Sequence, residues 1–214
     1  MKEEVVIIIS VIYFNKNKKL SYSNIRSIFS PKERLEQTYI TIKSIKEHIP
    51  KAKIFFFELG NGDLKDDYIN NSVYRYIYLG NNNIVRRAVN SKYKGLGEVI
   101  GLLFSRSYLP NQFTRLFKIS GRYYLNNNFS LKDWKVGNFI VKNNNNSIST
   151  RLYSISYEFY RFWIFILYIS LPFLLLNISI ENIIYIFTPK KYFKYLTTLG
   201  ISGKIGVNNQ TINE

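Results

Sequence analysis

The chain has 214 residues, of which 46% are hydrophobic and 17% aromatic, with no cysteine and a single histidine, His48. This composition excludes a disordered polypeptide, a disulfide framework and a metal site built from thiolates or several imidazoles. Thirty Lys and Arg residues against 14 Asp and Glu residues give a net charge of +16. That excess indicates an anionic partner, which could be a nucleic acid, an anionic lipid surface or a phosphorylated small molecule.

The N-terminal part of the chain predicts a β-α-β unit. Residues 5–12 form a continuous, mostly β-branched run, typical of a strand buried on both faces of a parallel sheet. Ser30-Pro31-Lys32-Glu33 predicts a helix start, because the serine can cap, the proline suits the first turn and the glutamate can bond back to the cap. We expect this helix to end near Ile49-Pro50, and residues 54–58 to form the next strand.

The rest of the chain continues the alternation and then changes character. Further strands are predicted at residues 74–79, 115–119, 138–142 and 149–154, and a helix at residues 97–109. This order predicts an α/β fold, a three-layer α/β/α sandwich with a mainly parallel central sheet. Past residue 155, long aromatic and aliphatic runs are typical of helices. We therefore expect one domain over residues 1–214, with an α/β core at 1–155 and a helical, aromatic subregion at 156–214.

Two segments bear on location. Residues 1–4 carry charges of both signs and lead straight into the first strand, which is unlike a signal peptide, so we expect a cytoplasmic protein. The apolar stretch at residues 162–176 is interrupted by Ser170 and Pro172 and is shorter than the roughly 20 residues of a membrane span. We expect a helix that is buried or that lies against a membrane, the latter making the protein peripheral on the inner face.

Candidate ligand-binding residues follow the predicted strands, because open α/β sheets bind ligands at the carboxyl ends of their strands. They are Glu58, the turn Ser120-Gly121-Arg122-Tyr123, and Arg151. A glycine lets the backbone approach a ligand, and an arginine fork matches phosphate oxygens. The alternative is an ordinary glycine turn followed by an exposed arginine. The position of the turn after a buried strand favours a diphosphate site.

Two helix starts add weaker candidates. Lys94-Gly95-Leu96-Gly97-Glu98 is a glycine-rich approach to a helix, whose N-terminus attracts anions, although it lacks the spacing of a Walker loop or a dinucleotide fingerprint. Glu98 in the first turn could equally serve the helix dipole. Arg34 and Gln37, on the first turns of the first long helix, either face the same sheet edge or face solvent.

A family resemblance rests on several of these segments in order. They are Glu33-Arg34-Leu35-Glu36-Gln37-Thr38, Ser44-Ile45, Ile49-Pro50, Lys94-Gly95-Leu96-Gly97-Glu98, Lys118-Ile119-Ser120-Gly121-Arg122-Tyr123 and Ser149-Thr150-Arg151-Leu152-Tyr153, with a similar ending at residues 199–206. Together they resemble small bacterial and viral glycosyltransferases with a GT-A-like nucleotide-diphosphosugar-transferase fold. The resemblance implies transfer of a sugar from a nucleotide-sugar donor to a glycan or lipid-linked acceptor in surface-polysaccharide biosynthesis.

The resemblance also implies roles for single residues. Typical members hold a divalent metal with an Asp-X-Asp element, but here the corresponding strand end reads Ser120-Gly121-Arg122. We therefore predict no metal ligands and no cofactor, with Arg122 and Lys118, Lys94 or Arg151 neutralising the leaving diphosphate; a divalent metal stays open as the alternative. The predicted donor-binding set is Arg34, Gln37, Glu58, Lys94, Lys118, Ser120, Gly121, Arg122, Tyr123 and Arg151. Glu98 and Glu181 are the candidates for the catalytic base, with a structural ion pair as the alternative for Glu181.

Two other functions compete with sugar transfer. The net charge permits a nucleic-acid-binding protein, although the basic residues are dispersed and no recognised binding motif occurs. A non-catalytic, glycosyltransferase-like scaffold would fit the missing Asp-X-Asp element. The C-terminal aromatic residues around Trp163 are predicted either to form the acceptor side, near an anionic membrane surface, or to pack in the core.

Overall fold

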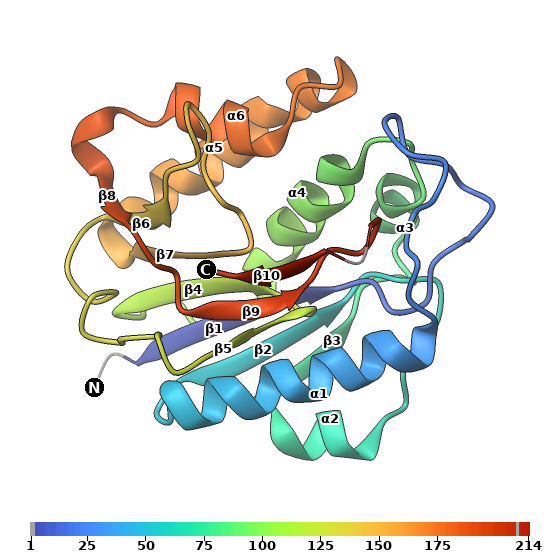
Figure 1. The fold of residues 1–214 in the computed structure, drawn as a ribbon, viewed down its shortest axis with the longest axis horizontal. Helices are drawn as coiled ribbons and strands as arrows, with labels where there is room; N and C mark the ends of the chain where they lie inside the picture. The colour runs from blue at the N-terminus through green and yellow to red at the C-terminus, as the bar shows by residue number, and fades with distance from the viewer. Residues whose placement is uncertain (1–2, 209) are drawn as a thin grey trace.

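The computed structural model describes residues 3–208 and 210–214, apart from the side chain of Lys94. Its central sheet has the strand order β3-β2-β1-β4-β7-β6-β8 (Figure 1). The strands are β1 Glu4–Ser10, β2 Lys53–Glu58, β3 Arg75–Tyr78, β4 Arg115–Ser120, β6 Phe139–Lys142, β7 Leu152–Ser156 and β8 Phe193–Leu196. The strands from β3 to β4 run parallel, β7 is antiparallel to both of its neighbours, and β8 is parallel to β6. The predicted mainly parallel sheet is confirmed.

Helices cover both faces of this sheet, as the predicted three layers require (Figure 1). On one face lie α1 Pro31–His48 and α2 Asp67–Ser72, and on the other lie α3 Asn83–Val89, α4 Lys94–Ser105, α5 Tyr157–Leu175 and α6 Ile180–Phe187. Short 3-10 turns follow at Arg106–Tyr108 and Lys190–Tyr192. The layers arise because β1 sends Val5 and Ile7 to the α3–α6 side and Val6 and Ile8 to the α1 side.

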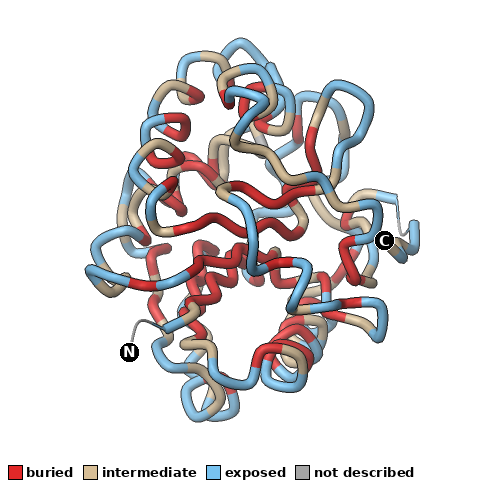
Figure 2. The backbone as a smooth tube through the Cα atoms, turned by 90° about the vertical axis from the view of Figure 1, so that its left-hand side faces the viewer, coloured by how far each residue is buried: buried red, intermediate tan, exposed pale blue. Residues whose placement is uncertain are grey.

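Burial follows the same pattern. In Figure 2 the buried segments gather in the middle of the molecule, where the strands lie, and the exposed ones lie at the periphery. The described part of β1 from Val5 to Ser10 is buried throughout. This is the burial that the continuous apolar run predicts for a strand covered on both faces.

The helix starts show what the sequence reveals and what it hides. The capping box predicted for α1 is present, with Ser30 Oγ accepting from the Glu33 N–H and the Glu33 carboxylate accepting from the Ser30 N–H. In contrast, α3 was not predicted, because the asparagines before it suggest a turn. Asn82 instead caps this helix by accepting from the Ile84 and Val85 N–H groups. The helix predicted at residues 97–109 begins earlier, at Lys94.

A second, small sheet is not evident from the sequence. Its strands are β5 Tyr123–Leu125, β9 Ile201–Lys204 and β10 Thr211–Asn213, in the order β10-β9-β5. They are too short to carry a readable alternation. At Gly203 a Cβ atom would lie 2.5 Å from the Arg122 carbonyl oxygen, so a glycine is needed there. This sheet brings the last described residues against the turn between β4 and β5.

The helix expected over residues 162–176 is part of α5. Among the described residues, α5 is the helix long and apolar enough to cross a membrane, with a mean hydropathy of 1.4 and 39% of that window buried. Its inner face places Trp163 and Leu167 in the core, whereas Phe165 and Tyr168 are exposed. The helix therefore has one face packed on the sheet and one apolar face turned outward.

Candidate functional site

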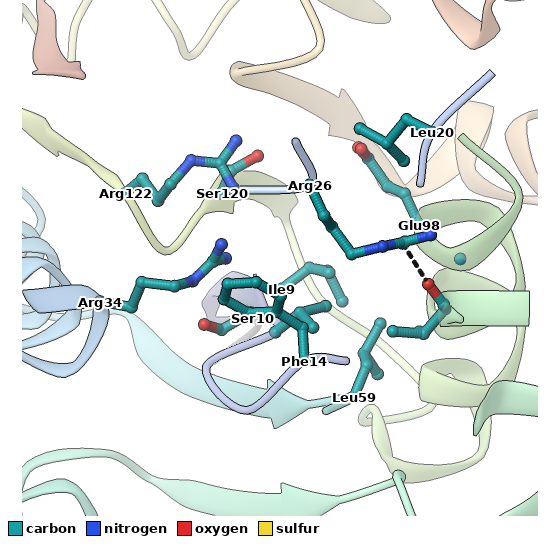
Figure 3. Close-up of a pocket in the computed structure, with 13 residues that line it drawn as sticks. Ile9, Ser10, Phe14, Leu20, Arg26, Arg34, Leu59, Glu98, Ser120 and Arg122 are labelled. Atoms are coloured by element: carbon teal, nitrogen blue, oxygen red, sulfur yellow. Dashed lines mark hydrogen bonds between the residues drawn. The ribbon is translucent and has the colours of Figure 1, made fainter. Parts of the chain in front are cut away.

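A cavity of about 100 Å³ lies at the carboxyl ends of β1 and β4, where the parallel sheet predicts a ligand site. We call it the central cavity (Figure 3). Its lining residues are Ile9, Ser10, Val11, Phe14, Leu20, Arg26, Arg34, Leu59, Val89, Gly97, Glu98, Ser120 and Arg122. Four residues of the predicted site are therefore brought together from α1, α4 and the β4–β5 turn: Arg34, Glu98, Ser120 and Arg122.

Two arginines dominate this cavity. Figure 3 shows Arg34 and Arg122 reaching into it from the same side. The Nε atom of each is buried and has no hydrogen-bond partner among the described residues. Burial, followed by the positive charge of Arg122, lowers the pKa of Arg34 to about 9. Two like charges held together with free buried donors form a site that favours an anion between them.

The packing of α1 against β5 sets the position of both arginines. One face of α1 carries hydroxyl groups that bind the β4–β5 backbone: Thr38 Oγ1 donates to the Gly121 carbonyl at 3.2 Å, and Thr41 Oγ1 donates to the Tyr123 carbonyl at 2.8 Å. Gly121 is buried, and a Cβ atom there would crowd Ser10 and Thr38 at 3.2–3.3 Å. Arg34 lies one helical turn before Thr38, so it reaches the cavity beside this turn.

The segment between β1 and α1, residues 11–30, covers the central cavity. Arg26 holds this segment against the end of α3. Its guanidinium donates to the carbonyls of Lys18 at 2.9 Å and Val89 at 2.7 Å, and also to that of Ser91. Phe14 lies under the Arg34 guanidinium, 5.4 Å from ring centroid to Cζ. Arg26 and Phe14 are not among the predicted site residues, because nothing in the sequence of a polar loop shows which of its side chains return to the sheet.

Lys118, which is fully buried, forms an ion pair with Glu98, whose side chain lies on the cavity wall and is 24% exposed. The Lys118 ammonium is fully buried and donates to Glu98, to Ser120 Oγ at 3.0 Å and to the Thr150 carbonyl at 2.7 Å. An ammonium has three donors, so all of them are used. Lys118 therefore ties α4, β4 and the approach to β7 together, and no donor remains for the phosphate contact that the sequence predicted.

A second cavity, the side cavity, lies next to the first and has a volume of about 170 Å³. It shares Glu98, Ser120 and Arg122 with the central cavity and adds Arg151 and Glu181, the latter on the first turn of α6. The remaining lining residues are Tyr123, Asn144, Ile148, Ser149, Thr150 and Ile205. The side cavity therefore places Arg122 and Arg151 in one space with both candidate catalytic carboxylates.

The polar groups of the side cavity differ in what they already bind. Glu181 Oε1 accepts from Thr150 Oγ1 at 2.8 Å, and its other oxygen accepts no hydrogen bond from the described residues. Arg151 donates to Glu214 at 2.9 Å. The Arg122 and Arg151 guanidinium groups lie 5.7 and 5.9 Å from the Tyr123 ring centroid, so this buried ring supports both cations.

A third cavity, the outer cavity, has a volume of about 400 Å³ and shares Glu98 and Glu181 with the side cavity. Its other lining residues are Ser21, Tyr22, Tyr93, Gly95, Leu174, Asn177, Ile178, Ser179 and Ile180. It lies between the 11–30 segment and the α5–α6 turn, which are joined by a hydrogen bond of 2.5 Å from Ser21 Oγ to Asn177 Oδ1. Glu98 lines all three cavities.

Glu58 takes a different place from the predicted one. It is fully buried and lines none of these cavities; its Oε1 accepts from the N–H groups of Ile12 and Gly60, both at 2.8 Å. The Glu58 carboxylate thus fixes the backbone after β1 and β2, and it does not face the cavities in which a nucleotide sugar could bind. Burial raises the pKa of Glu58 to about 7 against these two hydrogen bonds.

The raised pKa of Glu58 predicts a pH-dependent stability. The folded protein keeps this proton between pH 4.5 and about 7, where the unfolded chain loses it, so stability falls as pH rises through that window. Glu58→Gln keeps an acceptor oxygen and has no proton to lose. We expect thermal unfolding of this variant to lose less stability across the window, by about 3 kcal/mol at most. Glu47→Gln, at an exposed position, serves as control, and equal pH profiles for all three proteins would contradict the assignment.

The other predicted residues have clear positions. Gln37 is half-buried on α1, with its Oε1 buried and without a hydrogen-bond partner among the described residues, and it is not part of the central cavity lining. Lys94 begins α4, and its side chain lies outside the described part of the chain. That the assembled residues bind a sugar donor stays a prediction.

The side chains at the carboxyl ends of β1 and β4 do not fit a divalent metal ion. Mg²⁺ and Mn²⁺ prefer carboxylate oxygens, but the strand end where the resemblance places Asp-X-Asp holds Ser120 and Arg122. The Glu98 carboxylate on the cavity wall is bound to Lys118. Within the described residues, no group of three or more His, Cys, Asp or Glu side chains is placed to hold a metal ion.

Comparisons with known proteins define the fold. No protein-family model and no curated protein matches the chain. Mouse xyloside xylosyltransferase 1 in its apo form matches 92% of this chain and 85% of its own, with a TM-score of 0.50 and 7% identity. A glycosyltransferase involved in glycosylation of the major capsid of PBCV-1 matches 91% of this chain and 82% of its own, with a TM-score of 0.48 and 8% identity. 4-Diphosphocytidyl-2C-methyl-D-erythritol synthase from Anaerococcus prevotii DSM 20548 matches 91% of this chain and 88% of its own, with a TM-score of 0.47 and 10% identity.

The chain therefore has a GT-A-like fold. This confirms the fold class that the sequence predicts. At such low identity the likeness concerns the fold alone, and the chemistry has to be argued from the side chains of this chain.

Proposed function

We propose that this protein is a glycosyltransferase that moves a sugar from a nucleotide-sugar donor to a glycan or lipid-linked acceptor. The observation that carries the proposal is the pair of arginines, Arg34 and Arg122, that face one cavity at the carboxyl ends of β1 and β4 with buried, unpartnered Nε atoms. A diphosphate supplies the negative charge that this pair lacks. The solved glycosyltransferases that share the fold support the same class.

The proposed reaction uses these groups as follows. The bond between the sugar anomeric carbon and the diphosphate oxygen breaks, and the electron pair leaves with the nucleoside diphosphate. Arg34 and Arg122 stabilise the charge that develops on that oxygen, in place of a metal ion. A new bond forms between the anomeric carbon and the acceptor hydroxyl oxygen, and the hydroxyl proton passes to a carboxylate.

Glu181 suits the role of base better than Glu98. Glu98 is bound to the fully buried Lys118, and this ion pair holds the carboxylate in place on the cavity wall. Glu181 accepts one hydrogen bond from Thr150 and lines both the side and outer cavities. We place the acceptor in the outer cavity, so that its hydroxyl reaches Glu181 while the donor lies beside Arg122.

The experiment that tests this function is a thermal-shift and calorimetric screen against UDP-, GDP-, CMP- and dTDP-sugars, with and without EDTA and alongside a random oligonucleotide. We expect one nucleotide sugar to stabilise the protein, because a ligand that binds only the folded state raises its stability. We also expect EDTA to change neither binding nor transfer. Stabilisation by the oligonucleotide alone would contradict the proposal, and loss of binding in EDTA would contradict its metal-free form.

A further inference from the structure

The rim of the outer cavity carries exposed apolar side chains. The α5–α6 turn supplies Asn177 and Ile178 to the cavity wall, and the adjoining residues Leu175 and Leu176 are 53% and 73% exposed. Ile178 itself is 37% exposed. The cavity thus has two carboxylates at its inner end, Glu98 and Glu181, and leucine and isoleucine side chains in water at its rim.

The exposed leucines continue a stripe along the C-terminal part of α5. Phe165, Tyr168 and Pro172 are exposed and precede Leu175 and Leu176 at intervals of three and four residues, which places all five on one face of the helix. We call these five residues the α5 stripe. The opposite face packs in the core, so α5 cannot leave the fold to cross a bilayer without exposing Trp163 and Leu167.

The charge of this region identifies the partner that the stripe suits. From the start of α5 to the end of the turn after α6, residues 157–192, the cationic residues are Arg161, Lys190 and Lys191, and the acidic ones are Glu158 and Glu181. Arg161 is exposed and precedes Phe165 on the outward face of α5, and Lys190 and Lys191 are exposed after α6. An apolar helix face with exposed cations nearby is the pattern that binds an anionic bilayer in its interface.

We propose that the α5 stripe and the α5–α6 turn lie on an anionic lipid bilayer and hold the rim of the outer cavity at the headgroup level. A lipid-linked glycan is the class of acceptor that this placement serves. Its lipid stays in the bilayer while its sugar enters the outer cavity toward Glu181. This choice of acceptor rests on the proposed function, whereas the contact with the bilayer does not.

The test uses the full chain, flotation with vesicles, and a fluorescent label. Because the protein has no cysteine, Leu176→Cys can be labelled at one position with a polarity-sensitive dye, and Val136→Cys, at a site 72% exposed, provides a matched control. We expect the protein to float with phosphatidylcholine–phosphatidylglycerol vesicles and the dye at position 176 to shift to shorter wavelength, while the dye at position 136 does not. Leu175→Asp with Leu176→Asp should lower vesicle affinity about tenfold or more, and Ile84→Asp should leave it unchanged.

The following results with vesicles or in sedimentation would overturn the proposal. Failure to float with anionic vesicles, or flotation without a shift at position 176, shows that the stripe does not contact lipid. Retention on vesicles in alkaline carbonate indicates a spanning helix. A dimer in sedimentation analysis that the double aspartate variant dissolves indicates a second copy on the stripe. A failed donor screen would sink the proposed function and leave the vesicle result standing.

Discussion

Arg122→Ala is expected to lower nucleotide-sugar affinity by about 10- to 100-fold, because a charge-assisted hydrogen bond to phosphate contributes roughly 1.5–3 kcal/mol. The same change should not lower the melting temperature of the free protein. The charge of Arg122 lowers the pKa of the buried Arg34, which means that it opposes the charged form of Arg34. Removing Arg122 relieves this repulsion, so the loss of binding comes with equal or greater stability.

Calorimetry with the donor found in the screen measures this affinity, and thermal unfolding without donor measures the stability. Arg87→Ala is the matched control, because Arg87 is exposed on α3 and is absent from the linings of the three cavities. If Arg122→Ala kept full affinity, or unfolded many degrees earlier, the turn after β4 would have a structural role and not a phosphate-binding one.

Removing the charge of the two candidate carboxylates should have different effects: loss of turnover at Glu181 and loss of stability at Glu98. Glu181→Gln keeps the size of the side chain and an oxygen for Thr150, so donor affinity and stability should stay unchanged. Its turnover number should fall by about 100- to 10,000-fold, the usual contribution of a general base. Steady-state kinetics with donor and acceptor, set beside calorimetry with donor alone, separates the two effects.

Glu98→Gln should primarily reduce stability. It leaves the fully buried Lys118 without its carboxylate, and breaking a buried pair costs about 3–5 kcal/mol. Glu98→Gln with Lys118→Met removes both charges and should recover part of that stability. If the double variant were stable and inactive while Glu181→Gln kept its turnover, Glu98 would be the base.

The sequence predicted the parts of the fold that depend on local patterns. The β-branched run of β1 and the Ser30–Glu33 capping box depend on neighbours along the chain, and both are present. The strands of the small sheet depend on partners far away in sequence, so no local pattern reveals them, and α3 was missed because its Asn82 cap lies in an asparagine run that suggests a turn.

The candidate site divides in the same way. Arg122 follows a buried strand at the edge where α/β folds bind ligands, and it lines the central cavity at that edge. Glu58 also follows a strand, yet its side chain turns inward to the N–H groups of Ile12 and Gly60, because the β1 and β2 loops there need a buried acceptor. Strand position fixes the edge of the sheet, but only packing fixes which way a side chain points.

The small β10-β9-β5 sheet has a consequence for the order of folding. Its β5–β9 pairing joins Tyr123 to Gly203 and Leu125 to Ile201, residues that are 80 and 76 positions apart in the sequence. Because β9 is among the last elements to be synthesised, this pairing cannot form until residues 201–203 have left the ribosome. The parallel core from β1 to β4 can therefore form on the ribosome before Ile205 has arrived to complete the side cavity. A nascent chain would thus be compact well before it could hold a ligand.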